Sequence, residues 1–284
     1  MVERVYAYYP GCSLHATAKE YDVSTRLVCR SLGLQLKELE DWTCCGASSA
    51  HASSHLLGVA LPARNLALAR QTGLPLAVPC AMCFSRLRIA QHELEDSSTR
   101  EAVSRVLGQE LQDGVAVLPL LKVLAEEPLE VKRPLKGLKV ACYYGCLLVR
   151  PRKVMDLDDE DNPQLMDRLV ERLGAEPLDW GLKTDCCGAG LPLARPDIVH
   201  RLSHRLLARA KAQGAQAMAV ACPMCHSNLD MHQRDLEKEY GDKLGLPVFY
   251  FTQLMGLALG YSPKELMLDR HHTDPIPLLR RLEV

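Results

Sequence analysis

The segment Cys44-Cys45-Gly46, followed after 33 intervening residues by Cys80-Ala81-Met82-Cys83, occurs twice in this chain of 284 residues. Its second copy is Cys186-Cys187-Gly188, followed after the same interval by Cys222-Pro223-Met224-Cys225. Each cysteine of the first copy therefore has a counterpart 142 residues further along the chain. Self-similarity at a fixed spacing indicates duplicated structural units, so the cysteine pattern predicts two similar halves.

A fifth repeated cysteine comes before each copy, at a Gly-Cys step. Tyr8-Tyr9-Pro10-Gly11-Cys12 resembles Tyr143-Tyr144-Gly145-Cys146, and these two cysteines are 134 residues apart. The second half therefore has eight more residues in this interval, which we place in the polar loop at residues 151–164. Prolines, a glycine and several charges at residues 127–137 indicate a linker. We predict an N-terminal domain at residues 1–130 and a C-terminal domain at residues 137–284.

Short apolar runs alternate with stretches of helical periodicity in both halves. Such alternation is typical of parallel α/β units, in which ligands lie beyond the carboxyl ends of the strands, where the repeated cysteines fall. We therefore predict an α/β fold of two duplicated Rossmann-like domains, with parallel sheets related by pseudo-twofold symmetry. Strands are predicted at residues 4–9, 74–78, 138–143 and 217–221. Helices are predicted at residues 20–32, 56–71, 83–95, 165–173, 198–213 and 225–240.

Composition excludes several classes of protein. The net charge is −1, with 34 Lys and Arg against 35 Asp and Glu, and 5% of residues are aromatic, so nucleic-acid binding is not expected. No apolar run is long enough to span a membrane, and the N-terminus lacks the layout of a secretory signal. We therefore expect a cytoplasmic protein, in which 12 cysteines are better suited to metal binding than to disulfides.

Five repeated thiols per half exceed what the common thiolate sites need. Soft thiolates select zinc, Cu(I) or iron–sulfur clusters, and both a structural zinc and a cubane cluster use four ligands. Five thiols suit a cluster that is larger or more distorted than a cube. Two cysteines fall outside the repeat. Cys29 lies in a helical run and is expected to be buried in the core. Cys142 lies in a strand, as a sixth ligand or, in the favoured interpretation, as a core residue.

The complete pattern resembles the CCG-domain (cysteine-rich domain) family, and within it the HdrB branch of the heterodisulfide reductases. Segments that carry the resemblance, in addition to the cysteines, are Tyr8-Tyr9-Pro10-Gly11-Cys12-Ser13-Leu14 and Cys222-Pro223-Met224-Cys225-His226-Ser227-Asn228-Leu229. Further support comes from residues 20–24, 146–151, 250–254 and 257–260. The resemblance covers essentially the whole chain.

The resemblance implies a cofactor for each half, a noncubane [4Fe-4S] cluster held by five cysteines. Some relatives keep one such cluster and have zinc or another cluster in the other half, and the sequence leaves this alternative open. The vicinal cysteines Cys44, Cys45, Cys186 and Cys187 would be ligands at the reaction site. The first ligand set would be Cys12, Cys44, Cys45, Cys80 and Cys83, and the second Cys146, Cys186, Cys187, Cys222 and Cys225.

The activity implied is that of an oxidoreductase acting on sulfur groups. The chain would be the catalytic iron–sulfur component that reduces a small-molecule disulfide, or oxidises thiols, with one sulfur and one electron handled at each cluster. Arg150, His15 and His226 are candidate substrate-binding or proton-donating residues, each with an ordinary surface or supporting role as the alternative. Since the sequence has no ferredoxin-type cysteine run, dinucleotide fingerprint or Walker motif, we expect two partners, an HdrC-like iron–sulfur protein and an HdrA-like flavoprotein.

Two other hypotheses stay open at this point. The first is an electron-transfer component of a succinate, lactate or glycolate:quinone oxidoreductase, in which the apolar stretch at residues 249–261 lies on a membrane surface. A core helix is the favoured interpretation of that stretch. The second is a zinc-stabilised scaffold without redox chemistry, which would leave one thiol per half unused.

Overall fold

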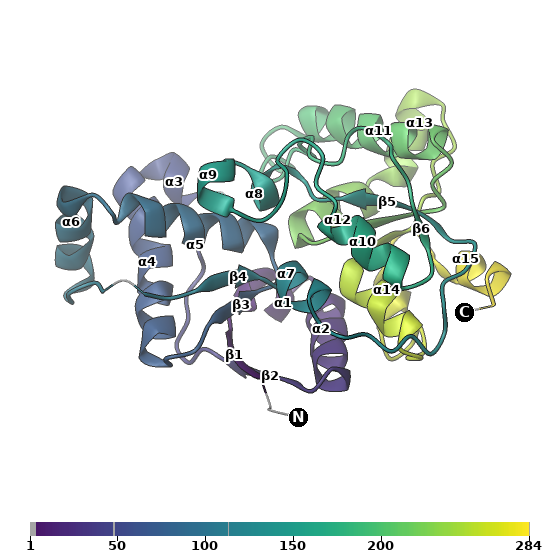
Figure 1. Cartoon of the computed structure of the whole chain (residues 1–284). Helices are drawn as coiled ribbons and strands as arrows, with labels where there is room; N and C mark the ends of the chain where they lie inside the picture. The colour runs from purple at the N-terminus through teal and green to yellow at the C-terminus, as the bar shows by residue number, and fades with distance from the viewer. Residues whose placement is uncertain (1–3, 48, 113, 284) are drawn as a thin grey trace.

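The computed structural model of the chain describes residues 4–47, 49–112 and 114–283. These ranges contain two four-stranded parallel sheets, one in each half (Figure 1). The first has the order β2-β1-β3-β4, with β1 (Arg4–Tyr8), β2 (Leu34–Glu38), β3 (Leu76–Val78) and β4 (Val117–Pro119). The second repeats it as β6-β5-β7-β8, with β5 (Lys139–Tyr143), β6 (Glu176–Pro177), β7 (Ala217–Val220) and β8 (Val248–Tyr250). The predicted duplicated α/β fold is confirmed.

The strands differ in how clearly their sequences indicate them. β3 and β7 are buried along their whole length, and their unbroken apolar runs are typical of parallel strands covered on both faces. The edge strands β2 and β6 were not predicted. In β2, buried Leu34 is followed by exposed Gln35, and β6 has two residues, so neither gives an apolar run.

Helices connect the strands in the same order in both halves. The predicted helices are confirmed to within two residues at each end, with one exception described below. The helices of the first half are α1 (Gly11–His15), α2 (Lys19–Ser31), α3 (Ala50–Ser53), α4 (His55–Gln71), α5 (Ala81–Glu93), α6 (Ser97–Leu107) and α7 (Leu120–Ala125). Those of the second half are α8 (Cys146–Val149), α9 (Arg152–Met155), α10 (Leu165–Arg172), α11 (Pro196–Ala212), α12 (Pro223–Asp230), α13 (Gln233–Tyr240), α14 (Phe251–Ala258) and α15 (Ile276–Arg281), with the short 3-10 helix η1 (Leu268–Arg270).

The exception is the helix predicted at residues 225–240, which is two helices, α12 and α13. The carbonyl of Leu229 accepts a hydrogen bond of 2.8 Å from the side-chain amide of Gln233, in place of that residue's backbone N–H. The carboxylate of Asp230 accepts the N–H groups of His272 and Thr273 from the C-terminal segment, at 2.7 and 3.0 Å. These distant partners fix a break that helical periodicity does not contain.

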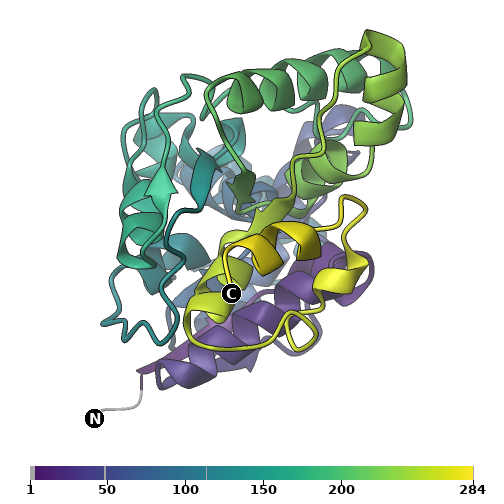
Figure 2. The ribbon, with the colours of Figure 1, turned by 90° about the vertical axis from the view of Figure 1, so that its right-hand side faces the viewer.

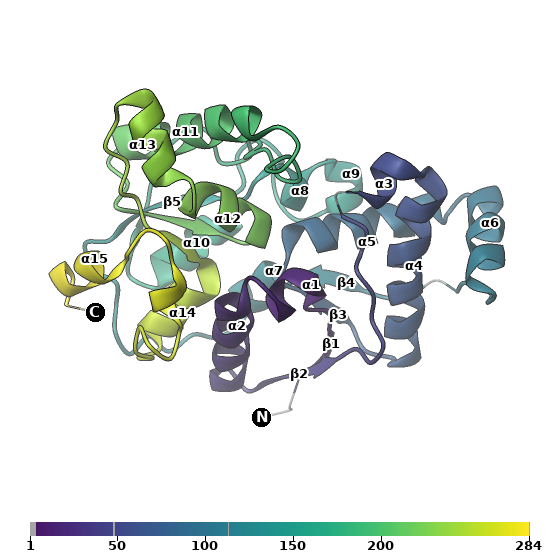
Figure 3. The same cartoon turned by 180° about the vertical axis from the view of Figure 1, so that it is seen from behind.

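The two halves share an extensive interface, in which α14 lies beside α2 (Figure 2 and Figure 3). The ring of Tyr21 in α2 stacks on Tyr250, with centroids 4.1 Å apart, and the hydroxyls of Ser24 and Thr252 are 2.7 Å apart. On the other side of the interface, the guanidinium of Arg88 in α5 donates to the carbonyl of Val154 at 2.9 Å. The halves therefore position each other through both packing and polar contacts.

The apolar C-terminal stretch belongs to this interface. Every residue of α14 is buried, including Leu254, Met255 and Leu257. The core interpretation of residues 249–261 is therefore correct, and the alternative in which they lie on a membrane surface is wrong. Among the helices of the described ranges, none has the length and apolarity needed to cross a membrane.

Candidate metal centres

The ten repeated cysteines lie at the carboxyl ends of the strands in both halves, as the sequence predicts. Cys12 follows β1 in the first turn of α1, and Cys146 is the first residue of α8 after β5. Cys80 and Cys222 precede the first residues of α5 and α12. The vicinal pairs lie in the loops after β2 and β6, so each half gathers five thiols from three strand-to-helix connections.

Glycines give these connections their shape. Gly46 and Gly188 follow the vicinal pairs with φ of +73° and +81°, a conformation that side chains disfavour. Gly11 and Gly145 make room for sulfur. A Cβ at Gly11 would lie 2.9 Å from Sγ of Cys83, and one at Gly145 would lie 3.3 Å from the sulfur of the matching thiol, Cys225. Each half is thus built for a close approach of backbone and thiol.

The thiols of each half lie in contact. In the first half, Sγ of Cys12 is 3.9 Å from Sγ of Cys44, and Sγ of Cys45 is 3.4 Å from Sγ of Cys83. In the second half, Sγ of Cys187 and Sγ of Cys225 are 3.5 Å apart. The structure therefore brings members of each proposed ligand set together from separate connections.

Burial differs across each set in the same way. The CxxC thiols and the second cysteine of each vicinal pair are buried. Cys12, Cys44 and Cys186 are exposed, and Cys146 is partly exposed. Each set therefore has a buried inner wall and an outer edge that a small molecule can reach.

The two sets meet at the interface between the halves. The N–H of Ala81 donates to the carbonyl of Ala221 at 3.1 Å, which joins one CxxC motif to the other. The thiols of Cys80 and Cys222 hydrogen-bond to each other, and this bond raises the pKa of Cys80 and contributes to the lowered pKa of Cys222. Two equivalent residues of a duplicated chain touch near a twofold axis, so this contact locates the pseudo-twofold relation between the halves.

The first cysteine of each vicinal pair favours the thiolate. Hydrogen bonding from Cys12 lowers the pKa of Cys44, with help from the N–H groups of Gly46 and Ala47. Hydrogen bonding from Cys146 likewise lowers the pKa of Cys186 to about 6. Thiolates are the form that binds metal, so these hydrogen bonds prepare the outer thiols for coordination.

One pair of supporting residues was missed at the sequence level. The hydroxyl of Tyr9 donates to the carbonyl of Thr43, and that of Tyr143 to the carbonyl of Asp185, each at 2.7 Å. Each carbonyl belongs to the residue before a vicinal pair. The signal was available, because both tyrosines come two residues before the Gly of the Gly-Cys step.

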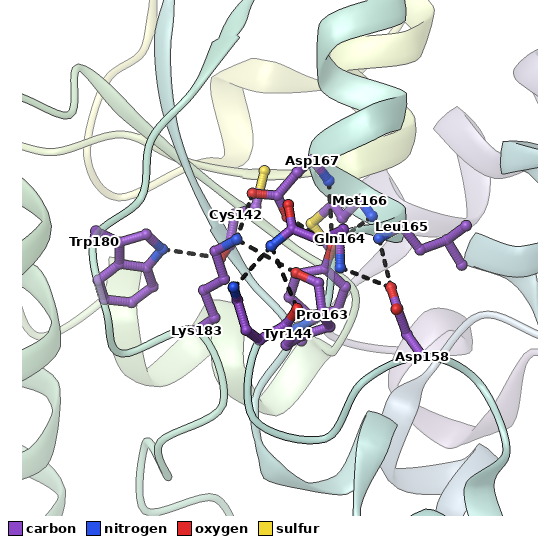
Figure 4. A network of polar contacts seen from close by, with 11 residues as sticks. Cys142, Tyr144, Asp158, Pro163, Gln164, Leu165, Met166, Asp167, Trp180 and Lys183 are labelled. Atoms are coloured by element: carbon purple, nitrogen blue, oxygen red, sulfur yellow. Dashed lines mark hydrogen bonds and ion pairs between the residues drawn. The ribbon is translucent and has the colours of Figure 1, made fainter.

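A buried polar network supports the second set (Figure 4). The ammonium of Lys183 and the hydroxyl of Tyr144 each donate to the carboxylate of Asp167 at 2.7 Å. The carbonyl of Lys183 accepts the N–H groups of Tyr144 and Gly145 at 2.9 and 3.1 Å. Cys142 is fully buried beside this network, and the indole of Trp180 donates to its carbonyl at 3.0 Å.

Two of the three candidate substrate residues have carboxylate partners in this structure. Arg150 donates to Asp161 at 2.8 Å and to the hydroxyl of Thr184 at 3.1 Å. His15 lies 2.8 Å from a carboxylate oxygen of Glu38 and has an exposed ring edge-on to Trp42. Both side chains lie in the segments that carry outer thiols, and their substrate roles stay predictions.

His226 is placed differently from the other two candidates. Its ring is buried against Tyr250, with centroids 4.3 Å apart, and its Nε2 donates to the carbonyl of Val248 at 2.9 Å. Burial lowers its pKa to about 4. These contacts describe a neutral supporting residue of the interface, the alternative given for it above.

Cys29 lies away from the ten thiols and is 1% exposed in α2, as expected of a core residue. It borders a cavity of about 1000 Å³ whose wall also includes Arg4, Arg30 and Pro128. A much smaller cavity lies among the second-half thiols. Its lining includes Tyr143, Gly145, Cys146, Cys187, Cys222 and Cys225.

The residues present fit an iron–sulfur cluster in each half. Five soft donors converge from three connections, glycines leave room beside the CxxC sulfurs, and the second half encloses a thiol-lined cavity. Within the described ranges, no three His, Cys, Asp or Glu side chains are arranged around a single metal-ion position. The fit therefore rests on the donor chemistry and on the space beside the sulfurs.

Curated relatives match nearly the whole chain. A protein of Wolinella succinogenes described as "8-methylmenaquinol:fumarate reductase membrane anchor subunit" is 34% identical over 284 residues, which is 98% of this chain and 100% of the relative. A protein of Methanosarcina acetivorans, described as the B-type component (HdrB) of a ferredoxin/F(420)H(2)-dependent CoB-CoM heterodisulfide reductase, is 30% identical over 288 residues, 96% of this chain and 95% of the relative.

Among solved structures, a hypothetical protein from Helicobacter pylori has the same fold. Its TM-score is 0.79 at 15% sequence identity, and the match covers 95% of this chain and 52% of that one, so this chain spans about half of that protein's length. The cysteine-rich domain family, CCG, matches residues 6–88 and 140–230, one copy in each half. With both cysteine sets inside these two matches, the chain belongs to the CCG cysteine-rich domain family.

Proposed function

We propose that this chain is the iron–sulfur catalytic component of a heterodisulfide reductase-like complex. It would reduce a small-molecule disulfide to two thiols, or run the reverse oxidation. The observation that carries the proposal is the pair of five-thiol sets that meet at Cys80 and Cys222. HdrB relatives at about 30% identity over nearly the full chain support this activity over the alternatives.

The residues of the chain would divide the work by depth. Cys80, Cys83 and Cys45, which are buried, would hold the inner side of the first cluster, and Cys12 and Cys44 its outer side. The second set would do the same. When bound, each cluster would supply one-electron transfer and an iron that accepts one sulfur of the substrate. Reduction of a disulfide takes two electrons and two protons, so two adjacent one-electron sites match the reaction.

The same residues define how a substrate is met. The exposed sulfurs of Cys12, Cys44 and Cys186 mark the side from which it would arrive, while the buried inner thiols exclude water from the other. His15 and Arg150 lie in the segments of the outer thiols and would contact anionic groups of the substrate after exchanging their present carboxylate partners. Electrons would come from, or go to, a flavoprotein and an iron–sulfur partner, and the free thiols suit the cytoplasm.

Anaerobic purification with metal analysis tests the proposal. We expect about eight irons per chain, the sum for two four-iron clusters, and a change in the cluster EPR signal when a thiol or disulfide is added. Cys83→Ser removes an inner ligand and should lower the iron content, whereas Cys29→Ser, which alters a buried thiol outside the sets, should leave it unchanged. A colourless protein with stoichiometric zinc and no iron would refute the proposal in favour of the zinc scaffold.

A second candidate is electron transfer with a quinone. The 34% identity to a component of a methylmenaquinol:fumarate reductase over nearly the whole of both chains favours it. The EPR experiment separates the two functions, because a signal that responds to a menaquinol analogue and not to disulfides would favour quinone chemistry. A response to disulfides alone would favour the reductase.

A further inference from the structure

The network around Asp167 joins the two segments that carry the outer thiols of the second half. Tyr144 lies two residues before Cys146, and Lys183 lies three residues before Cys186. Their backbones are joined directly, because the carbonyl of Lys183 accepts two N–H groups from the segment before Cys146. Figure 4 shows both side chains reaching the carboxylate of Asp167. A single buried group therefore holds both arms.

The network is complete in its hydrogen bonds. Each oxygen of Asp167 accepts one donor at 2.7 Å, and the hydroxyl of Tyr144 also accepts the N–H of Asp167 at 3.2 Å. The side chains of Lys183 and Asp167 are 4% and 7% exposed. The carboxylate stands in the first turn of α10, where the helix dipole favours a negative charge. A buried pair that is fully satisfied resists displacement, because moving either partner leaves the other charge unpaired.

The described residues of the first half contain no equivalent connection. Pro10 occupies the place of Tyr144 and has no N–H to donate, and Asp41 occupies the place of Lys183. The nearest analogue is a pair between Arg26 and Glu38, whose side chains are 36% and 30% exposed. Through Asp22 this pair is anchored to the hydroxyl of a residue in β1, rather than to the segment before Cys12. The two pseudo-equivalent sites are therefore supported unequally.

We propose that Tyr144, Asp167 and Lys183 form a positioning device that holds Cys146 beside the Cys186–Cys187 loop before any cluster binds. The inference rests on the proposed function in that it takes an iron–sulfur cluster as the ligand. A preset ligand arm loses less conformational entropy on binding. The second site therefore fills first and empties last, and the first site exchanges its cluster more readily. None of the three residues contacts substrate in this scheme.

The test measures each thiol separately in the apoprotein, by iodoacetamide labelling and mass spectrometry. Tyr144→Phe removes one hydroxyl and keeps the ring. We expect labelling of Cys146 to rise about tenfold, as for loss of a hydrogen bond to a charged group, with Cys12 unchanged. Tyr8→Phe removes the matching hydroxyl from Asp22 in the first half and should leave Cys146 unchanged. If the labelling of Cys12 and Cys146 rose together, or Cys146 stayed within about twofold, the proposal would be overturned.

Iron release provides the second readout. With a chelator, the reconstituted wild-type protein should lose iron in two phases of equal size, and Tyr144→Phe should lose it in one fast phase. A single phase in the wild type would overturn the inferred order. If Tyr144→Phe does not fold, the neutral pair Asp167→Asn with Lys183→Met takes its place. The labelling result does not depend on metal, so a wild type that binds no iron refutes the proposed function while labelling still reports on the positioning.

Discussion

Replacing Gly11 by alanine tests whether the thiol sites depend on a close approach of backbone and sulfur. Gly11 has φ of +73°, and a Cβ there would lie 2.9 Å from Sγ of Cys83, closer than van der Waals contact allows. The left-handed conformation costs an alanine about 1–2 kcal/mol. Because Cys83 is buried in α5, its sulfur has to move or the Gly-Cys turn has to open, which adds about 1–3 kcal/mol of overpacking.

Gly33→Ala is the matched control. Gly33 has φ of +70°, and its Cβ would meet nothing within 4 Å, so this variant carries the conformational cost without the sulfur contact. Both variants also lose the same glycine freedom in the unfolded chain, so that effect cancels in the comparison. The difference between them isolates the contact with Cys83.

Two assays measure the difference. Denaturant unfolding of the apoproteins should show Gly11→Ala to be less stable than Gly33→Ala by about 1–3 kcal/mol. Iron analysis after reconstitution should show Gly33→Ala at the wild-type content and Gly11→Ala at roughly half, because only the first site is disturbed. Equal stability of the two variants, together with full iron in Gly11→Ala, would show that the close approach is dispensable and refute the reasoning.

Three further predictions concern single residues. Tyr9→Phe should destabilise the apoprotein by about 1 kcal/mol through loss of the bond to the carbonyl of Thr43, and should lower iron at the first site alone, as measured by unfolding and iron analysis. Burial lowers the pKa of His271 to about 3, from 6.5 in the unfolded chain. The stability supplied by its neutral ring is therefore present above pH 6.5 and is lost as the pH falls toward 3, so His271→Leu should reduce the slope of apoprotein stability over this range; an unchanged slope would contradict the assignment. Cys45→Ser should lower iron content while Cys29→Ser destabilises without iron loss, and equal iron in both would remove Cys45 from the ligand set.

Much of the fold could be predicted because its signals are local. The buried strands β3 and β7 are unbroken apolar runs, and the helices after them begin at CxxC motifs of equal spacing. The edge strands β2 and β6 have no such run, because their place in a sheet comes from pairing with β1 and β5. The break between α12 and α13 was missed for the same reason. It depends on N–H groups of His272 and Thr273 that reach Asp230 from a distant part of the chain.

The site divides in the same way. The thiols could be chosen from the sequence because cysteine chemistry is specific and the spacing repeats, and the structure brings their sulfurs into contact. The substrate residues were chosen by nearness in sequence to a cysteine, which does not determine where a side chain points. His226 follows Cys225 directly, yet its ring packs against Tyr250 in the core of the interface. Nearness along a helix places a backbone, and neighbours from other elements decide the direction of the side chain.

The unequal support of the two halves is the part that duplication conceals. A repeat of ten cysteines predicts two equal sites, and comparison of the halves position by position shows only that Tyr144 and Lys183 correspond to Pro10 and Asp41. Neither difference suggests a network until α10 places Asp167 between the two side chains. Since the eight additional residues of the second half are placed between Cys146 and α10, the insertion lies in the same interval as the network. A duplicated scaffold can therefore keep its ligands identical while the surrounding residues give the two sites different stabilities.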